Sequence, residues 1–444
     1  MADSVPRFTD VDLETDALPV AGRTRIFKPS DASIESARPV ERKRTLSSTI
    51  DLPLLVLFGL LLAVGSLMIY SATFDWSSQD FGSDTYIFMQ HVRNMTIGGV
   101  AFLLLTFINY RVWKRFVVIL LLGTIGTLIA VLVFSDYTFG ARRAFLDGSY
   151  QPGELAELMI VIYMAAWLSS KNARVASIMY GLIPFIVIIG VVGGLVALQP
   201  DISTTMTIFI VAGLMFFLAG ANVLHLTGVL GFMGVAGYIL MEVFGYAQER
   251  VGFYIAGLTD LTQANYHAQQ AMIAFLNGGW WGVGLGQGRQ KFQALPTPHT
   301  DSIFAVIGEE LGFIGAGFVI ALFVLLVIRG LQIARRAHDP FGSLIAAGVT
   351  LWIVTKALMN IAVMVNLIPS TGVALPFISY GGSSLITVMA GAGLLMSVAR
   401  KTALENSPEG RTARAPDDRG WGNRWTRLSS HSNRRSAHGS SPRP

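Results

Sequence analysis

The sequence contains no cysteine among its 444 residues. This absence excludes disulfides, thiolate metal sites and cysteine nucleophiles. Charge is also scarce, since charged residues make up 14% of the chain and hydrophobic residues 52%, with a mean hydropathy of +0.54. Such a composition excludes an ordinary water-soluble domain and predicts an all-α polytopic membrane protein.

The two ends of the chain lack the long hydrophobic runs of the middle. Residues 1–50 show no short apolar run followed by a small-residue cleavage site, so a cleaved signal peptide is not expected. Residues 402–444 are rich in Arg, Ser, Gly and Pro, which bury too little apolar surface to fold. We predict disordered cytoplasmic tails at 1–50 and 402–444 around a transmembrane domain at 51–401.

About ten apolar windows have the length and composition of membrane-spanning helices. They are residues 52–70, 95–108, 116–134, 154–168, 175–198, 204–221, 223–244, 303–333, 344–367 and 385–398. The second and fourth are the weakest by apolar length. A large outer loop, residues 245–302, separates the seventh span from the eighth.

Basic residues in the short connections set the orientation. They precede span one, lie between spans two and three, four and five, and eight and nine, and follow span ten. All fall on one side if both termini are cytoplasmic, which predicts a bacterial cytoplasmic (inner) membrane protein. The net charge of +5 is explained by this retention and by anionic lipid, so no nucleic-acid partner is predicted.

The opposite connections carry distinctive polar sequences. These are GARRAFLDGSYQPGEL, ALQPDIST, the segment 245–302 and NLIPSTGVALPFISYGGSS. Since they share one membrane face, we predict a single composite site there. Turn-forming Pro and Gly would explain PSTG and GGSS without any site, but not the buried charges.

The stretch LPTPHTDSIFAVIGEELGF places three carboxylates around the entry to span eight. Asp301 lies just before the apolar run, where it serves either as a helix cap, a role that Thr300 shares, or as a catalytic group. His299 is a possible base or metal ligand, although a lone loop histidine is more often neither.

Glu309 and Glu310 lie about 12 Å further into the same span, at 1.5 Å per residue. A charge at that depth costs about 2.5–3.5 kcal/mol and needs a partner. Adjacent helical residues point about 100° apart, so the two carboxylates need different partners. We predict that one pairs with Arg142, Arg143 or Lys356 and the other with backbone groups.

Further charges converge on the same face. Glu154 and Glu157 are three residues apart and share a helix face at the head of span four. Asp201 ends span five and Lys356 lies in span nine. With Arg142 and Arg143, such a mixture suits a divalent cation and an anionic headgroup.

The outer segment itself contains an amphipathic stretch at 265–277, NYHAQQAMIAFLN, followed by Trp280 and Trp281. We predict an interfacial helix with the tryptophans at headgroup level, beside lipid substrates or as a simple anchor. The run GVGLGQG is similar to a phosphate-binding glycine loop, but no strand precedes it, so backbone flexibility is favoured.

In combination, GARRAFLDGSYQPGELAEL, LQPDIST, the stretch from YHAQQ to GEELGFIG, and IPSTGVALPFISYGGSSL resemble the SEDS family of membrane peptidoglycan polymerases, typified by FtsW and RodA. The resemblance covers about residues 52–401, in order. HTDxIFAxxGEELG and PFISYGGSS are its most specific parts. The form GVGLGxxxxK and the long N-terminal tail favour the FtsW branch.

The resemblance implies a ten-helix fold and transfer of glycosyl units from lipid II into β-1,4-linked glycan, with release of undecaprenyl pyrophosphate. It implies Asp301 as the general base, dependence on a divalent cation such as Mg²⁺ or Mn²⁺, and a class B penicillin-binding protein as partner, with other division or elongation proteins. Asp301 is the one candidate metal ligand. The predicted substrate-binding residues are Arg142, Arg143, Glu154, Lys356, Ser379, Gly381 and Gly382, and the predicted charge network is Glu309, Glu310, Asp201 and Glu157.

Three residues depart from the family pattern. Ser302 stands where Phe is usual, Glu157 replaces a lysine after QPxE, and Lys356 replaces a glutamine or arginine in span nine. We expect Lys356 to restore the positive charge that Glu157 removes.

Two other functions compete with polymerisation. A flippase for lipid-linked sugar suits buried charges and an outward cavity, but the cytosolic connections lack comparable motifs. A scaffold that only recruits a transpeptidase is the third possibility. Septal synthesis in division is favoured over an elongation-type, RodA-like role.

Overall fold

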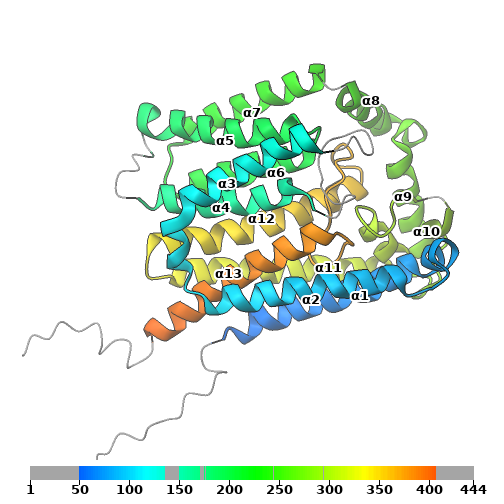
Figure 1. Cartoon of the computed structure of the whole chain (residues 1–444). Coiled ribbons are helices and arrows are strands. Elements are labelled where there is room, and N and C mark those ends of the chain that lie inside the picture. The colour runs from blue at the N-terminus through cyan, green and yellow to red at the C-terminus, as the bar shows by residue number, and fades with distance from the viewer. Residues whose placement is uncertain are drawn as a thin grey trace, which may run out of the picture. The chain divides into compact units, whose positions relative to one another are not determined.

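The structure is a computed structural model that describes residues 50–135, 150–170, 175, 177–243, 245–293 and 295–406. Its helices run nearly parallel in a bundle (Figure 1). The long helices are α1 (Leu52–Phe81), α2 (Tyr86–Phe107), α3 (Trp113–Phe134), α4 (Pro152–Leu168), α5 (Ile183–Ala197), α6 (Ile202–Leu218), α7 (Val223–Val243), α11 (Ile303–Arg336), α12 (Pro340–Met364) and α13 (Gly382–Asn406). Between α7 and α11 lie α8 (Gly245–Thr259), α9 (Tyr266–Gly278) and α10 (Gln290–Gln293).

Every predicted span is occupied by a helix, which confirms an all-α polytopic membrane protein. Within the described ranges, six helices are long and apolar enough by themselves to cross a membrane: α1, α3, η4 with α5, α11, α12 and α13. The windows predicted as weakest form α2 and α4, which are not among these six. The predicted ends differ in places, since α1 runs to Phe81 rather than residue 70.

Helices α12 and α13 form the centre of the bundle. In their most apolar windows 78% and 72% of residues are buried, against 28% for α3. Helix α12 packs against α4, α6, α11 and α13. A polar side chain on the inner part of α12 therefore faces protein rather than lipid.

Ion pairs join several connections at one end of the bundle. Arg111 binds Asp339, in the loop between α11 and α12, and Glu405 near the end of α13, each at 2.9 Å. Asp51 caps α1 and pairs with Arg329 of α11 at 2.6 Å. The basic connections that contain these residues thus meet at one end, as predicted.

The predicted C-terminal tail begins too early. Helix α13 continues to Asn406, and Thr402 is buried, because Glu405 is held by Arg111. Residues 1–49 and 407–444 lie outside the described residues, so the predicted disorder of the tails stays a prediction.

Helix α11 is interrupted rather than continuous. Gly312 has φ 70° and ψ −170°, which breaks the helix one residue after Leu311. The amides of Phe313 and Ile314 donate to the carbonyls of Gly279 and Trp280 at 2.9 and 3.2 Å. The loop after α9 thus supplies the backbone partners that the break removes from the helix, as a buried chain requires.

Candidate functional site

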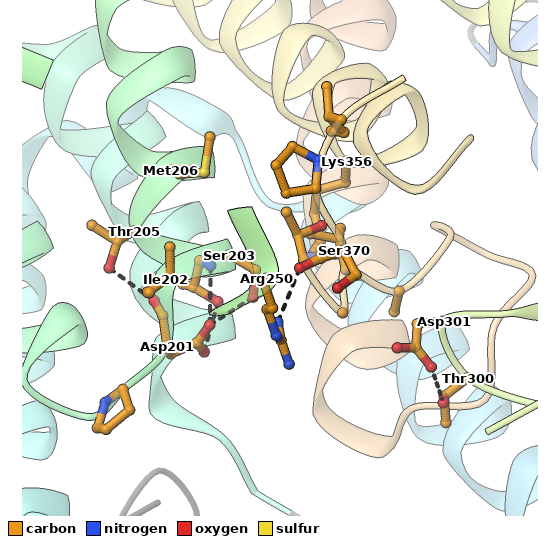
Figure 2. A pocket seen from close by; sticks show the side chains of 18 of the residues that line it. Asp201, Ile202, Ser203, Thr205, Met206, Arg250, Thr300, Asp301, Lys356 and Ser370 are labelled. Carbon is orange, nitrogen blue, oxygen red and sulfur yellow. Dashed lines mark hydrogen bonds between the residues drawn. The ribbon is translucent and has the colours of Figure 1, made fainter. Parts of the chain in front are cut away.

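The polar connections at the other end of the bundle enclose a cavity of about 1190 Å³. Its wall combines the start of α4, the start of α6, one side of α7 and α8, and the loops before α11 and between α12 and α13. The predicted composite site is therefore confirmed as one cavity built from segments far apart in sequence. Figure 2 shows its charged and hydroxyl groups.

Asp301 lies in this wall and does not cap α11. The N-cap residue is Ser302, whose side chain makes no capping bond. The Oδ1 atom of Asp301 instead accepts hydrogen bonds from the hydroxyls of Thr297 and, at 2.9 Å, Thr300 (Figure 2). The Oδ2 atom lies beside Gly372 and has no hydrogen-bond partner within the described part of the chain. One carboxylate oxygen is thus fixed and the other faces the cavity.

The backbone around Asp301 is held by α12 and by the loop that follows it. Asn360 of α12 donates from Nδ2 to the carbonyls of Asp301 and Val373, both at 2.7 Å. The Ser379 hydroxyl donates to the Thr300 carbonyl at 2.5 Å and accepts from the Leu375 amide at 2.7 Å. Two spans therefore fix the position of one loop.

Ser379 was predicted to bind substrate, and the structure corrects this. Its side chain is 4% exposed and is absent from the cavity wall, because both of its hydrogen bonds go to backbone groups. Gly381 and Gly382 do line the cavity. Ser379 supports the loop instead of contacting a ligand.

His299 packs among aromatic rings. It stacks on Trp76 with 4.7 Å between ring centroids and meets Tyr380 edge-on at 5.7 Å. Burial lowers its pKa to about 4, so the imidazole is neutral at neutral pH. His267 is also buried, which lowers its pKa, and its Nε2 lies 2.5 Å from the Ser302 hydroxyl. The unusual Ser302 thereby links α9 to the start of α11.

Glu154, Glu157 and Lys356 form one buried cluster at the floor of the cavity. Lys356 Nζ lies 2.5 Å from Glu154 and 2.9 Å from Glu157. Glu157 also accepts from the Trp352 indole at 2.8 Å. The expected exchange of charge between Glu157 and Lys356 is thus a direct ion pair, and the cluster holds two carboxylates and one ammonium.

Asp201 caps α6 and lines the cavity. Its Oδ1 accepts from the Thr204 amide at 3.1 Å and the Ser203 hydroxyl at 2.8 Å. Helix capping accounts for its conformation. Arg142 and Arg143, predicted to bind the substrate, lie outside the described residues.

Glu309 and Glu310 do not pair with Lys356, contrary to one of the predicted choices. Glu310 instead binds Lys291 at 2.6 Å and accepts from the Ser71 hydroxyl of α1. Glu309 accepts backbone hydrogen bonds from Arg289 at 3.0 Å and from Gln290, which confirms the predicted backbone partner. Lys356 is unavailable because Glu154 and Glu157 hold it.

The glycine-rich run GVGLGQG is therefore a carboxylate-binding loop. The Gly286 amide donates to Glu310 Oε2 at 3.1 Å, and the Val283 and Gly284 amides donate to the carbonyls of Glu309 and Glu310, each at 3.0 Å. Its amides are used within the protein, so neither phosphate binding nor simple flexibility describes it. The amphipathic stretch 265–277 is helical, as predicted, and forms α9; Trp280 and Trp281 are exposed.

Several residues of this region were missed in the sequence. They are Lys291, Asn360, Trp352 and Arg250, which has its side chain in the cavity wall. Lys291 is a basic residue inside an otherwise glycine-rich outer run, and that contrast is the signal available for it. Asn360 and Trp352 lie in an apolar span and give no such signal.

A divalent cation fits the site only in part. Among the described residues no group of three or more His, Asp and Glu side chains is arranged to hold a metal ion. Asp301 offers one carboxylate oxygen toward the cavity, and Mg²⁺ commonly binds one or two carboxylates together with substrate phosphate. Asp301 would hold such an ion only jointly with a phosphorylated ligand.

The fold and cavity define a multi-pass helical membrane protein with an acidic site at one end of its bundle. A family model described as "Cell cycle protein", FtsW/RodA/SpoVE, matches residues 52–404. The chain belongs to this family.

Similar proteins cover nearly the same region. A probable peptidoglycan glycosyltransferase FtsW of Geobacter metallireducens is 34% identical over 81% of this chain and 96% of its own. Stage V sporulation protein E of Bacillus subtilis is 34% identical over 80% of this chain and 98% of its own.

Solved structures agree with this fold. A structure titled "Structural coordination of polymerization and crosslinking by a peptidoglycan synthase complex" matches with a TM-score of 0.65 and 25% identity, covering 80% of this chain and 98% of that one. The rod shape determining protein RodA of Thermus thermophilus matches with a TM-score of 0.59 and 25% identity, covering 80% and 97%.

Proposed function

We propose that the protein is a peptidoglycan glycosyltransferase that polymerises lipid II into β-1,4-linked glycan. The observation that carries this proposal is the Asp301 carboxylate, held through one oxygen in the wall of a cavity large enough for sugar rings. The names of the relatives support the same activity. The role is septal synthesis in division, since the probable FtsW proteins are among the similar proteins.

In the proposed step, the 4-hydroxyl oxygen of one lipid-linked saccharide bonds to the anomeric carbon of another. The bond from that carbon to undecaprenyl pyrophosphate breaks, and the hydroxyl proton passes to Asp301 Oδ2. Thr297 and Thr300 hold the other carboxylate oxygen, and Asn360 holds the backbone, so the base keeps one orientation. A bound divalent cation would add positive charge at the pyrophosphate.

The surroundings follow from the same activity. Lipid II is exposed at the outer face of the bacterial cytoplasmic membrane, so the cavity opens outward and both termini are cytoplasmic. The basic connections at the opposite end of the bundle support this orientation. A class B penicillin-binding protein is the proposed partner, since the similar synthase complex joins polymerisation to crosslinking.

The test is polymerisation of labelled lipid II by the purified protein with a class B penicillin-binding protein, in Mg²⁺, in Mn²⁺ or with chelator. Asp301→Ala and Asp301→Asn should lower turnover by about 100- to 10,000-fold. Asp260→Asn is the matched control, because Asp260 lies on an exposed outer loop away from the cavity wall.

Equal product from wild type and Asp301→Asn would remove Asp301 from the chemistry. Translocation of lipid II across vesicles without polymer would favour the flippase. If Asp301→Ala supported growth of cells as well as wild type, the scaffold role would be favoured.

A further inference from the structure

The cavity wall is rich in carboxylates and poor in cations. Within the described residues its acidic groups are Glu154, Glu157, Asp201, Glu249 and Asp301, whereas its basic groups are Lys356 and Arg250. The ligand of the proposed function carries a diphosphate, so this wall needs positive charge that it does not spend on its own carboxylates.

Lys356 does not supply that charge. Its side chain is 2% exposed and lies between two carboxylates, at 2.5 and 2.9 Å. A ligand phosphate there would face the excess negative charge of the cluster. Of the two described cations in the wall, Arg250 is the exposed one.

Arg250 is held in place by backbone on the far side of the cavity mouth. Its Nη1 donates to the Ser370 carbonyl at 3.0 Å, and one turn later Tyr254 donates to the Leu367 carbonyl at 2.7 Å. Figure 2 shows the guanidinium beside Ser370, in the region between Asp201 and Asp301. A guanidinium has five N–H donors in a rigid fork, and the bond to Ser370 uses one of them.

Arg250 and Asp301 also lie near the same buried imidazole. Both charges act on His267, Asp301 raising its pKa and Arg250 lowering it, in addition to the larger lowering by burial. The loop that binds Arg250 through Ser370 approaches Asp301 through Gly372, whose added Cβ would lie 3.7 Å from Oδ2. The cation and the proposed base therefore border one space.

We propose that Arg250 binds the diphosphate of the lipid-linked saccharide, and that its bond to Ser370 orients the guanidinium for this contact. The inference rests on the proposed function and adds a substrate-binding residue to it. The diphosphate becomes more negative at the bridging oxygen as the glycosidic bond forms and the old C–O bond breaks. A guanidinium matches phosphate oxygens in two parallel hydrogen bonds, which suits both binding and departure of this group.

The competing explanation is that Arg250 only fastens α8 to the loop. Tyr254→Phe is the matched control, because it removes the second fastening bond and leaves the charge in place. Arg250→Gln removes the charge, and Arg250→Lys keeps the charge but loses the fork. Arg335→Gln removes the same charge from an exposed site on α11, away from the cavity wall.

The measurement is binding of undecaprenyl pyrophosphate, undecaprenyl phosphate and undecaprenol to each folded variant in detergent, followed by polymerisation kinetics. Arg250→Gln should weaken undecaprenyl pyrophosphate binding by about 10- to 100-fold, the loss expected for hydrogen bonds to a charged group. Undecaprenol binding should be unchanged. Arg250→Lys should fall between Arg250→Gln and wild type, while Tyr254→Phe and Arg335→Gln should keep the preference for the diphosphate.

Equal preference in wild type and Arg250→Gln would overturn the inference, as would an equal loss in Tyr254→Phe. The proposed function is judged separately. Polymer from wild type with unchanged diphosphate preference in Arg250→Gln would refute only the role of Arg250. Loss of that preference in Arg250→Gln, with no polymer from wild type, would support Arg250 and refute the polymerase.

Discussion

Breaking the buried pair of Lys291 and Glu310 should destabilise the protein strongly. The side chains are 1% and 0% exposed, and their charged atoms lie 2.6 Å apart. Lys291 also donates to the carbonyl and hydroxyl of Ser71, each at 2.9 Å, so its three N–H groups are all used. Glu310→Gln keeps the shape of the side chain but leaves an ammonium buried without its counter-charge.

The expected cost of Glu310→Gln is about 3–5 kcal/mol, the range for removing one partner of a buried pair. Replacing both partners by neutral groups of similar volume is often nearly neutral, so Lys291→Met with Glu310→Gln should recover much of the loss. The two changes should therefore be coupled by about 2 kcal/mol or more, toward the upper range for contacting residues.

Reversible unfolding of the four proteins of this double-mutant cycle, in mixed detergent, measures the coupling. Lys401→Met is the surface control, since Lys401 lies 4.0 Å from Glu405 and is 34% exposed, and it should cost at most about 1 kcal/mol. Additive effects of the Lys291 and Glu310 changes would refute the argument, because they would mean that the two charges do not depend on each other.

Three further changes test other parts of the structure. Gly312→Ala should destabilise by more than 1 kcal/mol or prevent folding, since φ is 70° and an added Cβ would lie 2.6 Å from the Trp280 carbonyl; expression and thermal unfolding would check this, and normal stability would contradict it. His299→Phe should flatten the pH dependence of stability: the unfolded histidine binds its proton near pH 6.5 and the folded one near 4, so wild type alone should lose up to about 3 kcal/mol as pH falls through that window. Equal slopes in both proteins would refute this account. Lys356→Met should lose about 3–5 kcal/mol because it leaves Glu154 and a second carboxylate unpaired, and Glu154→Gln added to it should restore part of the loss; no restoration in the unfolding curves would count against the cluster.

Much of the architecture follows from local sequence. A membrane requires apolar helices with satisfied backbones, so the apolar windows predicted where helices lie before any contact was known. Basic connections alternated with polar ones, and this alternation predicted that QPGE, QPDIST, HTD and PFISYGGSS meet at one end. These features depend on composition along the chain, which is why the sequence was sufficient for them.

The partners of the buried charges could not be read in the same way. Pairing depends on which side chains face each other across helices, and several pairings suit the same set of charges. Glu310 binds Lys291, from a loop that enters beside α1 and α11, because the break at Gly312 opens the backbone there. Lys356 instead faces α4, where Glu154 and Glu157 lie on one helix face.

The sequence by itself thus determined a polytopic helical protein, the end of the bundle at which its polar motifs gather, and the carboxylate proposed as the base. Only the tertiary structure decided that Asp301 leaves α11 uncapped, that Asn360 and Ser379 hold its loop, and that Arg250 lines the cavity. The physical reason is range: hydrophobic length acts along a segment, whereas hydrogen bonds and ion pairs act over a few ångströms between residues that only the folded chain brings together.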